Sequence, residues 1–145
     1  MARVTYNRAV LDAILHGKPA PKKIPRASAS ASESQIQQSC INWFKAQYPR
    51  LWEDGVLFHI ANEGIRLGGS GRRAKREGIV CGVADLCLAM PRKGFGALYI
   101  ELKRPGCYQR PSQRTWQKNI EKHGNKYCVV KSVDQFMEVI NNYLK

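Results

Sequence analysis

Two apolar segments, residues 83–90 and 97–103, lie on either side of a short turn that contains proline and glycine. Apolar runs of this length, bounded by turn residues, predict two β-strands joined as an antiparallel hairpin. With the turn at the midpoint of the hairpin, the register places Asp85 opposite Glu101, within one residue. Side chains alternate along a strand, so Lys103 lies on the same face as Glu101. The pattern therefore predicts two carboxylates and an ammonium group on one face of an otherwise apolar hairpin.

These charges have two interpretations. Taken alone, Glu101 and Lys103 fit a solvated strand face with a weak surface ion pair. However, two carboxylates that face each other are destabilising, and a divalent cation, which takes several oxygen ligands, would compensate them. Such a metal polarises a phosphoryl group and lowers the pKa of a bound water. Lys103 would then orient the attacking water or stabilise developing negative charge. We therefore favour a metal site, with Mg²⁺ or Mn²⁺ as the expected cofactor.

The charge balance points to a polyanionic partner. The chain has 24 Lys and Arg against 11 Asp and Glu, a formal net charge of +13. Nucleic acid is the usual partner of such a chain, and an anionic membrane surface is the alternative. No apolar run approaches the roughly 20 residues that a membrane span needs, and the N-terminus has no secretory signal pattern. We therefore expect DNA rather than a membrane as the partner.

The cysteines and histidines add two further expectations. Five widely spaced cysteines with no CxxC pair indicate reduced thiols, two or three of them in the core, and hence a cytoplasmic protein, in the host cell if the chain is phage-encoded. The three histidines are scattered, so a zinc site is not expected.

The chain divides into two parts. Residues 1–31 are predicted to form a short helix over residues 5–16 and then a flexible basic linker rich in Pro, Ser, Ala and Lys. Residues 32–145 are predicted to form one folded domain with its own core. The linker adds positive charge and contributes nothing to that core.

The domain is predicted to contain three helices. The first begins after Ser32, which forms a capping box with Gln35, and Pro49 ends it. The second follows Ser112 as its N-cap, and the third follows Ser132. Trp116, at helical spacing in the second helix, is read as a core residue rather than a base-stacking one. Two further strands are expected over residues 56–62 and 126–131. The predicted order is helix, three strands, helix, strand, helix, an α/β architecture.

At this point the sequence resembles the VRR-NUC branch of the PD-(D/E)xK nucleases. The ordered motifs are "SESQIQ", "ANEG", "GVADL", "YIELKRPG" and "SQRTWQKNIEKHG … VVKSVDQF", and together they cover about residues 32–144. The ExK spacing alone is a weak signal, whereas the ordered set is specific. The resemblance implies a restriction-endonuclease-like αβββαβ core, a mixed central sheet flanked by helices, with an extra C-terminal helix.

The resemblance also implies roles for individual residues. Asp85, Glu101 and the Leu102 carbonyl would bind the metal, and Lys103 would be the catalytic lysine. Glu33 would face the site from the first helix, although it also fits a simple helix-dipole role. Gln113 would supply a polar contact from the second helix. One departure is visible, because Ala84 stands where the family pattern has proline. Proline is not a ligand, so the departure concerns the local turn rather than the chemistry.

A glycine-rich basic segment over residues 63–78 could contact a phosphate backbone, although a solvated basic loop is an alternative. Asn62 and Glu63 are weaker site candidates that also fit a turn at a strand end. The residues expected to face DNA are Arg66, Arg72, Arg73, Lys75, Arg76, Arg104 and Arg110.

The sequence thus predicts a divalent-metal-dependent DNA endonuclease. The family resemblance adds a preference for branched DNA such as Holliday junctions, and a homodimer, since symmetric cleavage of a junction needs two sites. The alternative is a non-catalytic basic DNA-binding module, which would explain the charge but not the facing carboxylates. A subunit of a sequence-specific restriction system is a third interpretation, but 145 residues leave no room for a recognition domain.

Overall fold

The computed structural model describes residues 31–61 and 76–145. The predicted N-terminal helix and linker lie outside these residues. So do six of the site candidates: Asn62, Glu63, Arg66, Arg72, Arg73 and Lys75.

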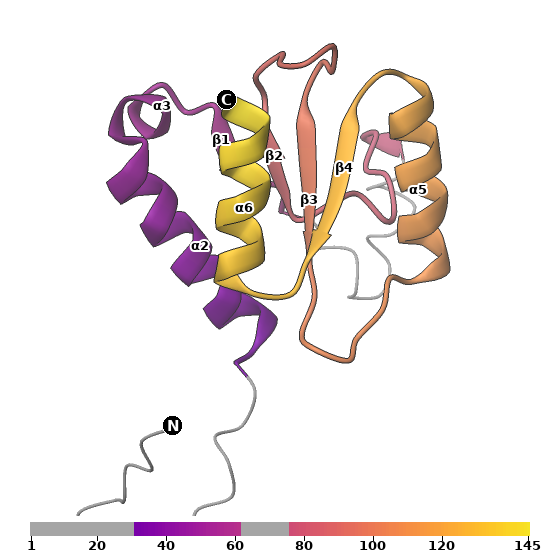
Figure 1. Ribbon diagram of the computed structural model, residues 1–145. Helices are drawn as coiled ribbons and strands as arrows, with labels where there is room; N and C mark the ends of the chain where they lie inside the picture. Colours follow the sequence, from indigo (N-terminus) through magenta and orange to yellow (C-terminus); the bar gives the residue numbers. More distant parts are fainter. Residues whose placement is uncertain (1–30, 62–75) are drawn as a thin grey trace, which may run out of the picture.

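A mixed four-stranded sheet organises the domain (Figure 1). Its strands are β1 (Leu57–His59), β2 (Leu86–Leu88), β3 (Leu98–Leu102) and β4 (Lys126–Val130), in that spatial order. β1, β2 and β3 pair antiparallel, and β3 pairs with β4 in parallel. A parallel pair needs a crossover, which α5 (Pro111–Lys122) supplies. The predicted element order and α/β fold class are confirmed.

The principal core lies on one face of the sheet, under α2 (Glu33–Gln47) and α6 (Val133–Leu144). Figure 1 shows these two helices side by side, with α5 apart from them along β4. Ile36, Cys40 and Phe44 of α2 and Phe136 and Ile140 of α6 are buried there. The apolar side chains at helical spacing thus pack where the sequence predicts. A short helix that the sequence did not predict, α3 (Pro49–Glu53), begins at the proline that was expected to end α2.

Two helix starts agree with the sequence and one does not. Ser32 and Gln35 form the predicted capping box of α2, and the Ser132 hydroxyl accepts from the Gln135 N–H at the start of α6. The prediction that Ser112 caps α5 is wrong. Arg110 is the N-cap, because Pro111 takes the first helical position, where its missing N–H costs no hydrogen bond.

The first three strands are shorter than their apolar runs. Asp85 was expected inside a strand over residues 83–90, but β2 begins only at Leu86. The predicted hairpin register is nevertheless confirmed, with Leu86 opposite Ile100 and Leu88 opposite Leu98. Asp85 therefore lies one residue before the start of β2, at the position that faces Glu101. Among the described residues, no helix is long and apolar enough to cross a membrane.

Candidate active site

Asp85 closes the end of the hairpin with its side chain. Its Oδ2 accepts a hydrogen bond of 2.7 Å from the Leu102 N–H, a donor that a longer β2 would have paired with a backbone carbonyl. Its own carbonyl accepts from the Ile60 N–H at 2.8 Å and lies 2.9 Å from His59 Nδ1. The Asp85 carboxylate is thus fixed by a residue of β3, and the Asp85 backbone is fixed by residues at the end of β1. These contacts hold Asp85 beside Glu101.

Glu101 is a fully buried carboxylate, with 0% of the residue exposed. Its Oε1 accepts from Lys103 Nζ and from Gln113 Nε2, and its Oε2 accepts from the Tyr127 hydroxyl at 3.2 Å. Lys103 is only 7% exposed. The interpretation of Glu101 and Lys103 as a solvated surface pair is therefore wrong. Burial of a charged pair is costly unless hydrogen bonds satisfy it, and three donors do so here.

Lys103 follows β3, and its backbone N–H donates to the Val130 carbonyl at 3.0 Å. Its Nζ also donates to the Leu102 carbonyl at 3.0 Å, and it lies 4.0 Å from Glu33 Oε1. Glu33 is the first residue of α2, and its side chain is 48% exposed. The structure thus brings together Glu33, Glu101 and Lys103 from two elements that are far apart in the sequence.

The Leu102 carbonyl faces the same edge of β3 as Asp85. In a strand, the N–H and C=O of one residue point the same way, and the Leu102 N–H is bonded to Asp85. The carbonyl is also close enough to Glu101 for one ammonium group, that of Lys103, to reach both.

Burial controls the electrostatics of the two acids. It raises the pKa of Asp85, opposed mainly by the hydrogen bond from the Leu102 N–H and by the charge of Lys103. Burial also raises the pKa of Glu101, the charge of Asp85 raises it further, and Lys103 and Tyr127 oppose the rise. The pKa of Tyr127 is raised by burial and by the charge of Glu101. Negative charge is therefore concentrated here, and a cation between the acids would relieve it.

These residues fit a hard divalent cation. Such ions prefer carboxylate and carbonyl oxygens, and Asp85, Glu101 and the Leu102 carbonyl offer such oxygens. Two of these three groups already converge on one cationic atom, Lys103 Nζ. Within residues 31–61 and 76–145, no group of three or more His, Cys, Asp or Glu side chains could hold a metal. The Leu102 backbone carbonyl is therefore needed for a third protein ligand.

A glycine sets the distance between the hairpin and α5. Gly82 has φ of +83°, and a Cβ added there would lie 2.5 Å from the backbone of Ser112 and 2.8 Å from the Gln113 nitrogen. Backbone cannot move aside as a flexible side chain can, so only glycine fits. This close approach brings the start of α5 to the segment that leads into Asp85 and so helps to place Gln113 on Glu101. Ala84, at the family's proline position, is fully buried.

Tyr127 is a site residue that the sequence did not indicate. It lies on β4, directly opposite Tyr99 in the parallel register, so it shares a face with Glu101. Trp116 of α5 packs edge-on against both tyrosines, with ring centroids 5.0 Å from Tyr99 and 6.0 Å from Tyr127. Trp116 is thus a packing residue, but it is half-buried and lies outside the principal core in which it was expected. The parity of residues along β4 could have identified Tyr127 only if the β3–β4 register had been known.

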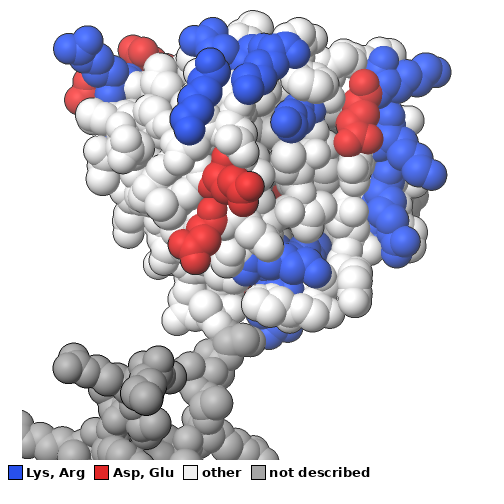
Figure 2. Space-filling view, viewed as in Figure 1, with Lys and Arg blue, Asp and Glu red and all other residues white. Residues whose placement is uncertain are grey.

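The cations near the site come from the loop after β3 and from α5. Arg104 and Arg110 are exposed, as is Arg76. Figure 2 shows Lys and Arg gathered along the α5 side of this face, where Arg114, Lys118 and Lys122 are exposed. The basic character predicted for the chain is therefore present on the described part of the surface next to the site.

The fold is similar to that of a solved structure. A protein described as "VRR_NUC domain protein" is 25% identical in sequence and covers 80% of this chain and 90% of its own, with a TM-score of 0.68. No family model matches the sequence, and no curated protein matches it. The structural match confirms the resemblance to the VRR-NUC family and the restriction-endonuclease-like fold class, and it indicates a nuclease-family domain.

Proposed function

We propose that this protein is a metal-dependent DNA endonuclease that hydrolyses phosphodiester bonds. The observation that carries the proposal is the buried Glu101. Its carboxylate is kept beside the Asp85 carboxylate, although burial raises the pKa of both acids and the charge of Asp85 raises the pKa of Glu101 further. A purely structural core would be expected to avoid this arrangement. The proposal is also supported by the similarity to a VRR_NUC domain protein.

The proposed chemistry assigns one task to each group. Asp85, Glu101 and the Leu102 carbonyl would hold Mg²⁺ or Mn²⁺, which supplies Lewis-acid polarisation of the phosphoryl group and a more acidic bound water. Lys103 would position the water or stabilise the negative charge that develops on the phosphate. Gln113 and Tyr127 orient Glu101 through their hydrogen bonds. Glu33, 4.0 Å from Lys103, would orient the ammonium group.

A non-catalytic DNA-binding module is the alternative function. Its basic surface is compatible with the structure, but its paired acids would repel the phosphates that the cations attract. We extend the proposal to branched DNA as substrate and to a homodimer, whose two sites would cut both strands of a junction. We also propose a cytoplasmic location, because Cys40, Cys81, Cys87, Cys107 and Cys128 are free thiols.

The test is a cleavage assay with the purified full chain. Four-way junctions, flaps, duplex and single strands are incubated with Mg²⁺, with Mn²⁺ and with EDTA, beside the Asp85→Ala variant. We expect metal-dependent cleavage of branched DNA by the wild type and none by the variant, which should still bind DNA. Full activity of Asp85→Ala, or cleavage in EDTA, would overturn the proposal. Sedimentation of the same samples tests the dimer.

Binding measured against salt tests the basic surface separately. DNA affinity should fall steeply between ~50 and ~200 mM salt, with a log–log slope of roughly −0.9 for each phosphate neutralised. Removal of residues 1–31 should weaken binding without abolishing cleavage by saturating enzyme, since that segment carries charge but no proposed site residue. A flat salt dependence would contradict a basic DNA-binding face.

A further inference from the structure

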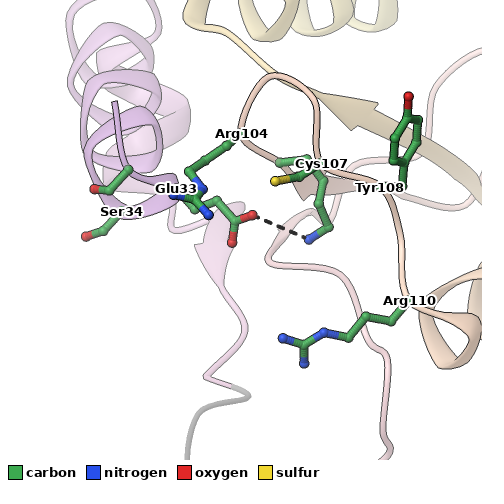
Figure 3. A pocket seen from close by; sticks show the side chains of 8 residues that line it. Glu33, Ser34, Arg104, Cys107, Tyr108 and Arg110 are labelled. Carbon is green, nitrogen blue, oxygen red and sulfur yellow. Dashed lines mark ion pairs between the residues drawn. The ribbon is translucent and has the colours of Figure 1, made fainter. Parts of the chain in front are cut away.

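A cavity of about 520 Å³ opens beside Lys103 (Figure 3). It lies between the start of α2, at Ser32–Ser34, and the loop that joins β3 to α5, and Arg104 and Arg110 line it. In Figure 3 the Arg110 side chain extends toward this opening. The cavity is therefore continuous with the candidate active site through Lys103.

The charges of this cavity favour an anion. Three cations line it against one carboxylate, Glu33, which lies 4.0 Å from Lys103. Within the described ranges, Arg104 and Arg110 are in no ion pair. Guanidinium groups bind phosphate through paired N–H donors. The cavity is thus suited to a phosphate next to the one that is cleaved.

Tyr108 stands at the rim of this cavity and is 80% exposed. In Figure 3 its ring points away from Glu33. Lys131 Nζ lies 4.9 Å from the ring centroid, so a cation–π contact orients the ring while most of it stays accessible. Exposed aromatic rings beside cationic grooves are the stacking platforms of single-stranded nucleic-acid binding sites.

We propose that this cavity and its rim bind an unpaired DNA strand next to the cleaved bond. Arg104 and Arg110 contact its phosphates, and one base stacks on Tyr108. The base must be unpaired, because a base inside a duplex already has both faces covered by its neighbours. The inference rests on the proposed function for the identity of the polymer. It narrows the substrate to DNA with a single-stranded arm or gap beside the cut.

The experiment measures binding in EDTA, so that it does not depend on cleavage. Fluorescence anisotropy reports the affinity of the full chain for a short single-stranded oligonucleotide and for a blunt duplex. The variants are Tyr108→Ala and Tyr108→Phe, with Phe58→Ala as the matched control, since Phe58 is 44% exposed on β1. Tyr108 is mostly exposed, so its variants should fold, which circular dichroism checks.

Loss of a base stack by alanine substitution corresponds to about 5-fold to 150-fold weaker binding. We expect this loss for Tyr108→Ala on the single strand, a smaller loss on the duplex, and near-wild-type binding for Tyr108→Phe and Phe58→Ala. A 2-aminopurine base in the oligonucleotide should lose the part of its quenching that depends on Tyr108. Equal losses on single strand and duplex, or no loss, would overturn the inference.

Cleavage of a flap separates this inference from the proposed function. If the wild type binds single strands through Tyr108 but cleaves no DNA with Mg²⁺ or Mn²⁺, the inference stands and the proposed function fails. If the wild type cleaves a flap and a fully paired junction equally well, and Tyr108→Ala does the same, the proposed function stands and the inference fails.

Discussion

The two faces of β3 differ in chemistry, because one carries apolar side chains and the other carries charged ones. Leu98, Ile100 and Leu102 point to α2 and α6 and pack into an apolar core. Glu101, with Lys103 just after the strand, points to the other face, where Tyr127 and Gln113 meet it. Both faces are buried at this point, yet only one is apolar. The strand therefore shows that burial alone does not identify a core: the hydrogen-bond partners distinguish the stabilising face from the candidate site.

The face of the sheet under α2 and α6 contains large, fully buried side chains, which α5 on the other face lacks. Phe44, Phe136, Ile140 and Tyr143 are all 0% exposed, whereas no residue of α5 is fully buried. Because the hydrophobic effect scales with buried apolar area, the α2–α6 face should supply most of the stability. The α5 face should contribute less and instead fix the geometry of Glu101. Substitutions on the two faces should then separate stability from activity.

The largest effect is expected for Glu101→Gln. Glutamine keeps the shape and the hydrogen bonds, because its amide oxygen can accept from Lys103 and Gln113 while its NH₂ group faces the Tyr127 hydroxyl. It removes the charge that would hold a metal. Single-turnover cleavage should fall by a factor on the order of 10³ or more, since metal catalysis is worth several kcal/mol.

The control for Glu101→Gln is its binding of DNA in EDTA, which should be unchanged or tighter because one repulsive charge is gone. Urea denaturation measures how far the loss of the charge that pairs with the buried Lys103 ammonium lowers the free energy of unfolding, and cleavage is compared under conditions in which the variant is folded. Cleavage at the wild-type rate would place the metal elsewhere, and the α5 face would then be only an unusual core.

The opposite pattern is expected for Phe136→Ala on the α6 side. Phe136 is fully buried and packs edge-on against Trp43, with ring centroids 5.9 Å apart. Truncation should lower the free energy of unfolding by about 3–5 kcal/mol, as measured by urea denaturation. The cleavage rate of the molecules that remain folded should stay close to wild type. A loss of rate as large as that of Glu101→Gln would show that the two faces are not independent.

The hairpin could be predicted from the sequence because the signals that specify a hairpin are local. Apolar runs on either side of a turn fix both the register and the parity, and these placed Asp85 against Glu101 as the structure does. The capping box at Ser32 was predicted on the same ground. The start of α5 was not, because Ser112 and Arg110 compete within three residues and Pro111 decides the outcome.

The burial of Lys103 and the role of Tyr127 could not be predicted in the same way. Both depend on β4 lying beside β3, a pairing between segments separated by a helix, whose register no local pattern sets. The Lys103 N–H donates to Val130, and Tyr127 reaches Glu101 only because of this register. The requirement for glycine at position 82 is also non-local, because the backbone of α5 leaves no room for a Cβ there.

A smaller but still large effect is expected for Lys103→Met. The variant keeps the length of the side chain but leaves Glu101 with only the neutral donors Gln113 and Tyr127. Single-turnover cleavage at saturating Mg²⁺ should drop by a factor on the order of 10². Lys103→Arg should not restore the rate fully, because a planar guanidinium cannot occupy the position of a compact ammonium. A wild-type rate for Lys103→Met would reduce its pair with Glu101 to a structural feature of the α5 face.

The smallest effect separates two tyrosines on the same face. Tyr127 and Tyr99 are opposite each other and both pack on Trp116. Of the two, the Tyr127 hydroxyl donates a hydrogen bond to Glu101. Loss of a group that orients a metal ligand costs about 10-fold to 100-fold in metal affinity or activity. Tyr127→Phe should therefore weaken Mn²⁺ binding, measured calorimetrically, while Tyr99→Phe should not, although each removes one hydroxyl from the same cluster. Equal effects of the two variants would mean that the aromatic cluster acts only by packing, and that Lys103 and Gln113 alone orient Glu101.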